Sequence, residues 1–433
     1  MSRWRTRRWS LSSAPLKILL LSDKVDHASS DLRGMKPLAV LEEATLAVVG
    51  VHGITEIINE TKPEDVNPDN PDSKIREFVR DLGLCDLIVI PQTTSIAWGK
   101  FVPMWQEMGK VVVLDTDDDI RYVSPLSPAY MTRGTEEVTV TIRSADGTEK
   151  KVPLWKDGQV EGDTGQFGTD NKTSKAPSAK FSLADNRMFQ KMYQDTMKQV
   201  DAITCPTQRY AETLRREINP NSFCLPNCLD LNEWKPGRHP GRDGFRIAWH
   251  GGDSHRIDVM AASEGLRGFL ENHKDAIFVL MGANLNEWLM NVPPDQLEYW
   301  DWSSYDAHNW RLQCMALDVG LCPVIDHKFN DAKSPLKWEE FAACGVPSIC
   351  SNHPPYSDAV RNGEDGILVA NDPLAWEKAL TELYNDSGER LALGERARKR
   401  IERDFNIWDK AVEWHALYSK LLEEKKSRTV VGA

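Results

Sequence analysis

Residues 329–351 read FNDAKSPLKWEEFAACGVPSICS, and this stretch predicts a helix built to face an anionic ligand. Lys333 and Lys337 are four residues apart, so on a helix they would lie on one face. Ser334 is a candidate cap, and Pro335 favours the first helical turn. The free N–H groups at the start of this helix would point the same way as Lys333, and a diphosphate is the simplest anion for such a site.

Two neighbouring carboxylates follow the lysines on the same predicted helix. Glu340 falls almost two turns into it, where its carboxylate can accept hydrogen bonds from sugar hydroxyls. We therefore predict that Ser334, Glu339 and Glu340 contact the ligand. Gly345 ends the helix, and residues 348–350 continue as a short apolar strand.

Residues 340–347, EFAACGVP, resemble the nucleotide-sugar motif of the retaining, family-4-like glycosyltransferases with the GT-B fold, the glycosyl transferases group 1. That motif reads roughly E-A-x-A-x-G-x-P and is followed by a strand rich in Val and Ile. Further on, Tyr356 and residues 363–369, GEDGILV, resemble the family's stretch ending in G-x-x-G-x-L-V. The resemblance covers about two thirds of the chain and is strongest from residue 245 to the end.

The resemblance implies an α/β protein with the GT-B fold, in which two Rossmann-like domains with doubly wound parallel sheets face each other across a cleft. It also implies a hexosyltransferase that moves a monosaccharide from a nucleotide-diphosphate sugar to an acceptor hydroxyl, with retention and without a metal or other cofactor. Lys333 and Lys337 would then be catalytic, because they neutralise the departing diphosphate. Glu340 would hold the ribose hydroxyls.

One position departs from the family's pattern. The family usually has a first glutamate eight residues before the second, and Ala332 stands there in this chain. The neighbouring Asp331 and Asn330 are candidates for the missing hydrogen bonds to the donor sugar. The donor base and sugar therefore stay open.

The composition is that of a globular protein with more than one core. The chain has 433 residues, of which 41% are apolar and 27% charged, and this length predicts two domains. A net charge of −12 disfavours a protein that grips nucleic acid with its whole surface. Eight cysteines without a C-x-x-C pair indicate free thiols in a reducing compartment, and no stretch resembles a signal peptide or a membrane span. We therefore predict a cytoplasmic protein.

The sequence also predicts how the chain is divided. Residues 1–14 carry four arginines and two tryptophans, which is typical of a disordered basic arm or of one that touches an anionic acceptor or membrane. Residues 15–235 are predicted to form an N-terminal acceptor domain, with a hairpin and flexible insertion at 131–180. A Pro- and Gly-rich linker at 236–244 leads to a C-terminal nucleotide-sugar domain at 245–405. A helix at 406–433 is predicted to cross back to the first domain.

The first predicted strand runs into a polar loop that would line the cleft of a doubly wound fold. His27 and Arg33 lie in this loop, and we predict that they contact the acceptor or a phosphate; the alternative is that they are solvated loop residues. The elements predicted around it are buried strands at 17–22, 86–91 and 110–114 and helices at 35–48 and 96–108.

Residues 115–119, DTDDD, end a predicted parallel strand, where carboxylates would point into the ligand crevice and raise one another's pKa values. Three interpretations are open: a divalent-metal site, a group that orients or deprotonates acceptor hydroxyls, or a cap for the next helix. Because enzymes with the GT-B fold generally work without metal, we predict no metal site. Asp117 and Asp118 are assigned a catalytic role and Asp115 an acceptor-side role.

Residues 250–256, HGGDSHR, form a glycine-bearing loop between a predicted strand and a predicted helix. Glycines let the backbone approach a phosphate, and the helix start offers N–H donors. In the GT-B glycosyltransferases that the chain resembles, a glycine loop with basic residues lies against the donor diphosphate. The predicted donor contacts are Gly251, Gly252, Ser254, His255 and Arg256.

The acceptor is open at the level of sequence. A glycan or a lipid-linked acceptor fits an acidic chain. The DDD motif and the inserted hairpin are also similar to phage-encoded glycosyltransferases, some of which act on hydroxymethylated bases in DNA. A third alternative is a nucleotide-sugar-binding module that has lost transfer activity, because Ala332 replaces the usual glutamate.

Overall fold

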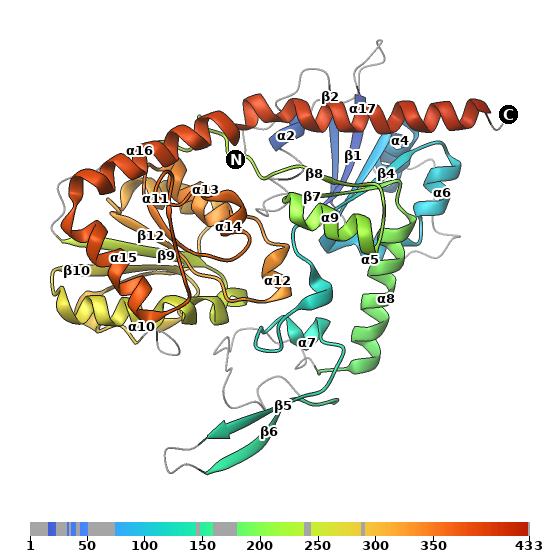
Figure 1. Cartoon of the computed structure of the whole chain (residues 1–433). Coiled ribbons are helices and arrows are strands. Elements are labelled where there is room, and N and C mark those ends of the chain that lie inside the picture. Colours follow the sequence, from blue (N-terminus) through green and yellow to red (C-terminus); the bar gives the residue numbers. More distant parts are fainter. Residues whose placement is uncertain are drawn as a thin grey trace.

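The computed structural model of the chain describes residues 16–22, 33, 36–39, 44–50, 74–143, 148–158, 180–237, 244–286 and 291–431. Within these ranges two α/β units lie side by side, and the long helix α17 (Ile407–Val431) runs along the first of them (Figure 1). The predicted arm at 1–14, the loop residue His27 and most of the linker 236–244 lie outside the described residues.

The first unit is built on a six-stranded parallel sheet with the strand order β2-β1-β3-β4-β7-β8. The order reverses between β1 and β3, which is the kind of switch point where doubly wound sheets bind ligands. The strands are β1 (Leu16–Ser22), β2 (Ala44–Gly50), β3 (Leu87–Pro91), β4 (Val111–Asp115), β7 (Ala202–Cys205) and β8 (Ser222–Cys224).

The helix predicted over residues 35–48 is wrong in its second half. The chain forms only the short helix α2 (Lys36–Ala39) there, and the run ATLAVVG becomes strand β2, which pairs with β1 along its whole length. A short apolar run cannot be assigned to helix or strand by periodicity alone. Thr45, Val48 and Val49 are β-branched, which favours the strand.

The helix predicted over residues 96–108 is divided into α5 (Ser95–Gly99) and α6 (Val102–Glu107). Pro103 lies in the first turn of α6. A proline ring clashes with the carbonyl four residues earlier, which belongs to Gly99, so the helix must end there and start again. The remaining helices of this unit are α4 (Lys74–Leu84), α7 (Tyr130–Arg133), α8 (Leu183–Gln199) and α9 (Gln208–Glu217).

The second unit is built on another six-stranded parallel sheet, with the order β11-β10-β9-β12-β13-β14 and a switch point between β9 and β12. Its strands are β9 (Phe245–Gly251), β10 (Ala276–Gly282), β11 (Leu297–Trp300), β12 (Val319–Cys322), β13 (Ser348–Ser351) and β14 (Ile367–Val369). Its helices are α10 (Arg256–Asn272), α11 (Tyr305–Cys314), α12 (Lys328–Asp331), α13 (Leu336–Ala343), α14 (Tyr356–Ala359), α15 (Pro373–Asn385) and α16 (Ser387–Asp404).

Helices cover both faces of the second sheet. Ile247 packs in one core cluster with residues of α10 and α15, whereas the next residue, Ala248, packs in another with residues of α13 and α16. Successive side chains of a strand point to opposite faces, so a strand buried on both sides reads as a continuous apolar run. This is why most strands of the two sheets were recognisable in the sequence.

The last helix returns to the first unit. Trp414 is fully buried in a cluster with β1, β3 and β4 of the first sheet. Where the chain crosses back, it runs beside the segment that leaves the first unit: Leu229 N donates to Phe405 O at 2.9 Å, and Ile407 N donates to Leu229 O at 3.1 Å. The two units are therefore joined by two crossings that are hydrogen-bonded to each other.

The hairpin predicted inside the insertion is present. Strands β5 (Val138–Arg143) and β6 (Glu149–Trp155) pair antiparallel and project away from the first unit (Figure 1). Among the described residues, no helix has the length and apolarity that crossing a bilayer requires.

Candidate active site

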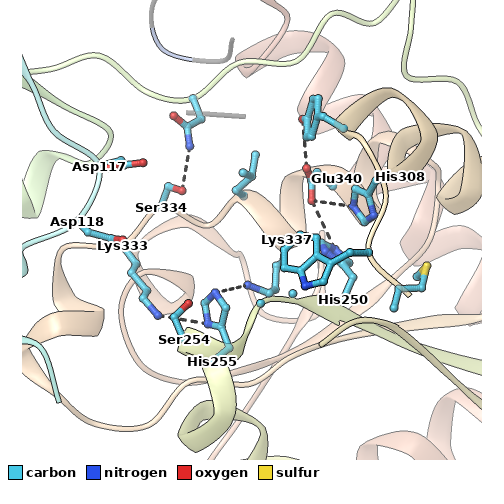
Figure 2. Close-up of a pocket in the computed structure, with 18 of the residues that line it drawn as sticks. Asp117, Asp118, His250, Ser254, His255, His308, Lys333, Ser334, Lys337 and Glu340 are labelled. Carbon is cyan, nitrogen blue, oxygen red and sulfur yellow. Dashed lines mark hydrogen bonds and ion pairs between the residues drawn. The ribbon is translucent and has the colours of Figure 1, made fainter. Parts of the chain in front are cut away.

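A cavity of about 590 Å³ opens between the two units, a size typical of small-molecule sites. Its walls come largely from the loops at the carboxyl ends of strands in both sheets, where doubly wound folds bind ligands. The predicted site residues that line it are Arg33, Asp117, Asp118, Gly251, Gly252, Ser254, His255, Lys333, Ser334, Lys337 and Glu340 (Figure 2).

Three predicted site residues that the structure describes do not line this cavity. Arg256 donates two hydrogen bonds to Asp253, at 3.1 and 2.9 Å. Glu339 is buried away from the cavity, and burial together with the neighbouring Glu340 raises its pKa well above the usual range. Asp115 is buried behind the wall.

The two predicted lysines converge on one histidine. Lys337 Nζ donates to His255 Nε2 at 2.9 Å, and Lys333 Nζ lies 3.2 Å from both His255 Nδ1 and Asp258 Oδ2. His255 Nδ1 is 2.9 Å from the same Asp258 oxygen. A histidine with its proton on Nδ1 fits these contacts, because it donates to Asp258 and accepts from Lys337.

The reason for this convergence differs from the prediction. Lys333 lies in the turn after α12, before α13 begins at Leu336, so the two lysines do not share a helical face. Pro335 occupies the cap position, where the backbone is not yet helical. The lysines meet because the turn folds Lys333 back toward α10.

This basic wall is electropositive. Burial, followed by Lys333 and Lys337, lowers the pKa of His255 to about 3, so the histidine is neutral. Burial and the nearby Lys333 lower the pKa of Lys337 to about 8. Burial alone would raise the pKa of Asp258, but Lys333 and His255 bring it below its usual value. Two ammonium groups thus lie close together on this wall, and they would attract an incoming anion.

The glycine loop packs tightly against this wall. A Cβ at Gly251 would meet Trp249 at 2.9 Å and the Cε of Lys337 at 3.2 Å. The neighbouring Gly282 has φ +98, and a Cβ there would lie 2.4 Å from the carbonyl oxygen of Gly251. Only glycines allow the two strand ends to approach this closely and leave backbone facing the cavity.

A second group of side chains gathers around Glu340, one turn after Lys337 on α13. Tyr305 OH donates to its Oε1 at 3.2 Å, while its Oε2 lies 3.5 Å from His250 Nε2 and 3.7 Å from His308 Nε2. Burial, His308 and Lys337 together lower the pKa of His250 well below its usual range, so this ring is neutral. Glu340 is the member of the glutamate pair that faces the cavity (Figure 2).

The aspartates at the end of β4 do not share one role, and those that follow Asp115 divide into a pair that lines the cavity and one that caps a helix. Asp117 and Asp118 line the cavity from the first unit (Figure 2). Burial, followed by repulsion from Asp117, raises the pKa of Asp118 to about 7, although Lys333 and Lys337 oppose this shift. Asp119 instead caps the short 3₁₀ helix that follows and pairs with Arg121 at 2.6 Å.

A chain of polar contacts links the two units at the edge of the cavity. Arg33 donates two hydrogen bonds to the carboxylate of Asp115, at 2.6 and 2.8 Å, and a third to Asn227 Oδ1 at 3.0 Å. Asn227 Nδ2 donates to Ser334 Oγ at 2.9 Å. Arg33 therefore holds the start of α13 through Asn227, and Asp115 fixes Arg33 rather than reaching the cavity itself.

The neighbours proposed to replace the missing glutamate do not line the cavity. Asn330 is buried and donates to Asp258 Oδ1 at 2.7 Å, and Asp331 lies 3.2 Å from His353. Ala332 is buried in the core cluster of the first unit. The backbone around this position is thus committed to packing and to holding Asp258.

Several lining residues were not predicted from the sequence. Asp258, which does not line the cavity but holds His255 and Lys333, carried a weak signal, because it follows His255 by three residues at the start of α10. His250 ends the predicted strand and could have been chosen for that reason. His308 and Tyr305 lie on α11, and nothing in their local sequence points to a ligand.

Comparisons with known proteins bear on both the fold and the site. The glycosyl transferases group 1 family matches residues 333–400, which include both lysines and Glu340. No curated protein sequence matches the chain significantly.

Solved structures resemble the whole chain at low sequence identity. A sucrose-phosphate synthase from Thermosynechococcus elongatus superposes with a TM-score of 0.58 at 14% identity, covering 94% of this chain and 100% of the other. A glycosyltransferase from Rickettsia africae gives 0.57 at 12%, covering 94% and 99%. HepE of Anabaena, crystallised with UDP, gives 0.55 at 10%, covering 94% and 100%. The chain therefore has the predicted GT-B fold, with its cavity in the cleft between two doubly wound domains.

Proposed function

We propose that the protein is a glycosyltransferase that moves a hexose from a UDP-sugar to an acceptor hydroxyl. The observation that carries this proposal is the convergence of Lys333 and Lys337 on the cavity, 3.2 and 2.9 Å from opposite nitrogens of His255. Two ammonium groups that converge on one part of the cavity favour a ligand with more than one negative charge, such as a diphosphate. UDP is the proposed nucleotide because HepE, which has the same fold, was crystallised with UDP and with UDP-glucose.

The reaction breaks the bond between the anomeric carbon and the diphosphate, and negative charge develops on the leaving oxygen. Lys333 and Lys337 would stabilise this charge in a site already prepared for it, which is the most effective form of electrostatic catalysis. The backbone at Gly251 and Gly252 would let the diphosphate approach, and Glu340 would accept hydrogen bonds from the ribose hydroxyls.

The acid wall would orient the acceptor. Asp117 and Asp118 line the cavity from the first unit, and an ionised carboxylate there can accept a hydrogen bond from an attacking hydroxyl. We propose retention at the anomeric carbon, with the leaving diphosphate taking the acceptor proton on the same face. Since lysines neutralise the diphosphate, the transfer would need no metal.

Among possible acceptors, we favour a glycan or a lipid-linked sugar over DNA with hydroxymethylated bases. The acceptor wall carries carboxylates and the chain has a net charge of −12, both of which repel a phosphate backbone. We also propose that the protein acts in the cytoplasm, because none of its eight cysteines, all in the described residues, forms a disulfide.

Thermal-shift screening against UDP-, GDP-, ADP-, CMP- and dTDP-sugars tests which donor the protein binds. Mass spectrometry of reactions with glycan, lipid-linked and hydroxymethylcytosine-DNA acceptors then tests which acceptor it modifies. We expect stabilisation by a UDP-sugar, transfer that survives EDTA, and retention seen by NMR of the product. No response to any nucleotide sugar would refute the donor site. Binding without turnover on every acceptor would refute the transferase and leave a binding module.

The depressed pKa of Lys337, about 8, predicts how UDP binding depends on pH. Only the protonated lysine attracts the diphosphate, so the contribution of Lys337 to affinity is complete well below pH 8 and is lost as pH rises above it. The fall approaches tenfold per pH unit, because binding then requires uptake of one proton. Isothermal titration in two buffers of different ionisation enthalpy checks this uptake at pH 8.5. Lys337→Arg should remove it, because arginine stays charged.

A further inference from the structure

A second feature of the cavity is not explained by sugar transfer. His250, at the end of β9, His308 on α11 and Glu340 on α13 come from three separate elements and present one ligand atom each to a common point. Their ligand atoms all lie within 4.8 Å of one another. The dashed contacts in Figure 2 show the two imidazole rings facing the same carboxylate.

One atom of this group has no hydrogen-bond partner. No described residue forms a hydrogen bond with His250 Nε2, although the side chain is buried. The nearest carboxylate oxygen, Glu340 Oε2, lies 3.5 Å away, beyond ordinary hydrogen-bond length. A buried imidazole nitrogen left without a partner costs free energy, so it calls for a ligand.

The spacing matches that of ligands around one metal ion. Two ligand atoms bound at about 2.1 Å to a tetrahedral ion lie about 3.4 Å apart. In this chain the two nitrogen-to-oxygen distances are 3.5 and 3.7 Å, so small side-chain movements would complete the set. We infer that His250, His308 and Glu340 form a binding site for one divalent transition-metal ion of the zinc class.

The chemistry of the three ligands determines the class of ion. Two imidazoles and one carboxylate suit Zn²⁺ and similar ions, whereas Mg²⁺ and Ca²⁺ prefer oxygen ligands alone. Tyr305 OH holds the other carboxylate oxygen at 3.2 Å, an outer contact of the kind that orients metal ligands. All three ligands line the cavity, so a fourth coordination position would open toward it.

Metal content and cobalt spectroscopy test the site directly. Untagged protein equilibrated with Zn²⁺ in a chelator-buffered solution should retain one ion per chain by elemental analysis. Co²⁺ should give the visible absorption of a four- or five-coordinate nitrogen and oxygen site. His308→Gln should weaken binding by more than roughly 100-fold, because losing a ligand costs more than losing an outer contact.

His353→Gln is the matched control, because it removes a histidine of the same domain that lies outside the group, and it should bind the ion as the parent does. Glu340→Gln keeps the size of the side chain and should lose the ion like the His308 variant. The site would be overturned if the parent protein bound no ion. It would also be overturned if the parent and both ligand variants bound the ion equally, a result that would point to the cysteines.

Occupancy of this site has a consequence that rests on the proposed function. Glu340 cannot bind the ion and the ribose hydroxyls with the same oxygen, so Zn²⁺ should act as a competitor of the donor rather than as a cofactor. The apparent Kd for UDP, measured at a series of free Zn²⁺ concentrations, should rise linearly with that concentration. The rise should vanish in His308→Gln. An unchanged Kd would overturn the exclusion, while the metal-content measurement stands independently of UDP.

Discussion

Lys337→Met should lower the turnover number of the proposed transfer by about 10²–10³, the effect of removing one charge-stabilising group from a prepared site. Lys337 Nζ lies 2.9 Å from His255 Nε2, on the wall where the diphosphate is expected. Its positive charge matters most when the leaving oxygen becomes negative, so kcat should fall more than the affinity for the donor. Initial rates at saturating UDP-sugar, measured as UDP release, give this number.

Two controls make the result specific. Lys337→Arg keeps the charge but not the shape, and should retain more activity than the methionine variant. Lys378→Met removes a lysine of the same domain whose side chain is 76% exposed, and should leave the rate unchanged. Equal rates for the parent and Lys337→Met would show that the leaving group is stabilised elsewhere.

Trp414→Ala should lower the free energy of unfolding by about 3–5 kcal/mol, the usual cost of deleting a large buried aromatic side chain. Trp414 is fully buried where α17 packs against the first sheet, in a cluster with Ile18, Val89 and Val113. The cavity left behind would be lined by strand residues that cannot collapse into it, because the sheet is rigid. Urea unfolding followed by circular dichroism measures the change.

Val412→Ala provides the comparison for this stability prediction. Val412 lies on the same helix but is 57% exposed, and its truncation should change the free energy of unfolding by no more than about 0.5 kcal/mol. A similar loss in both variants would mean that the effect does not depend on burial of the truncated side chain, because alanine has the higher helix propensity in both cases. In that case its packing on the first sheet would not be the cause.

The fold was largely predictable because its signals are local and repeated. Runs such as 87–90 and 111–114 are apolar without interruption, and a strand buried on both faces must be so. The motif from Glu340 to Pro347 specified the second domain. Strand β2 was missed because a short apolar run reads equally well as helix, and only its pairing with β1 decides.

The site was predictable only in part, because its geometry depends on contacts between distant segments. The family motif pointed to Glu340, but local sequence did not exclude Glu339 as a second contact, since the rotation of α13 is set by Trp338 and Phe341 packing beneath it. Lys333 was chosen correctly as a cavity residue for the wrong reason. His308 reaches Glu340 only through tertiary packing of α11, which no local pattern records.

The paired crossings at Leu229 and Ile407 restrict how the protein can open. A single flexible connection would let one domain rotate in any direction relative to the other. Two backbone segments that are hydrogen-bonded to each other at one place would instead act as a hinge. Such a joint would limit the directions in which the halves can separate. A joint that guides closure in this way would bring Asp118 and Lys333, which both line the cavity, back to the same relative position.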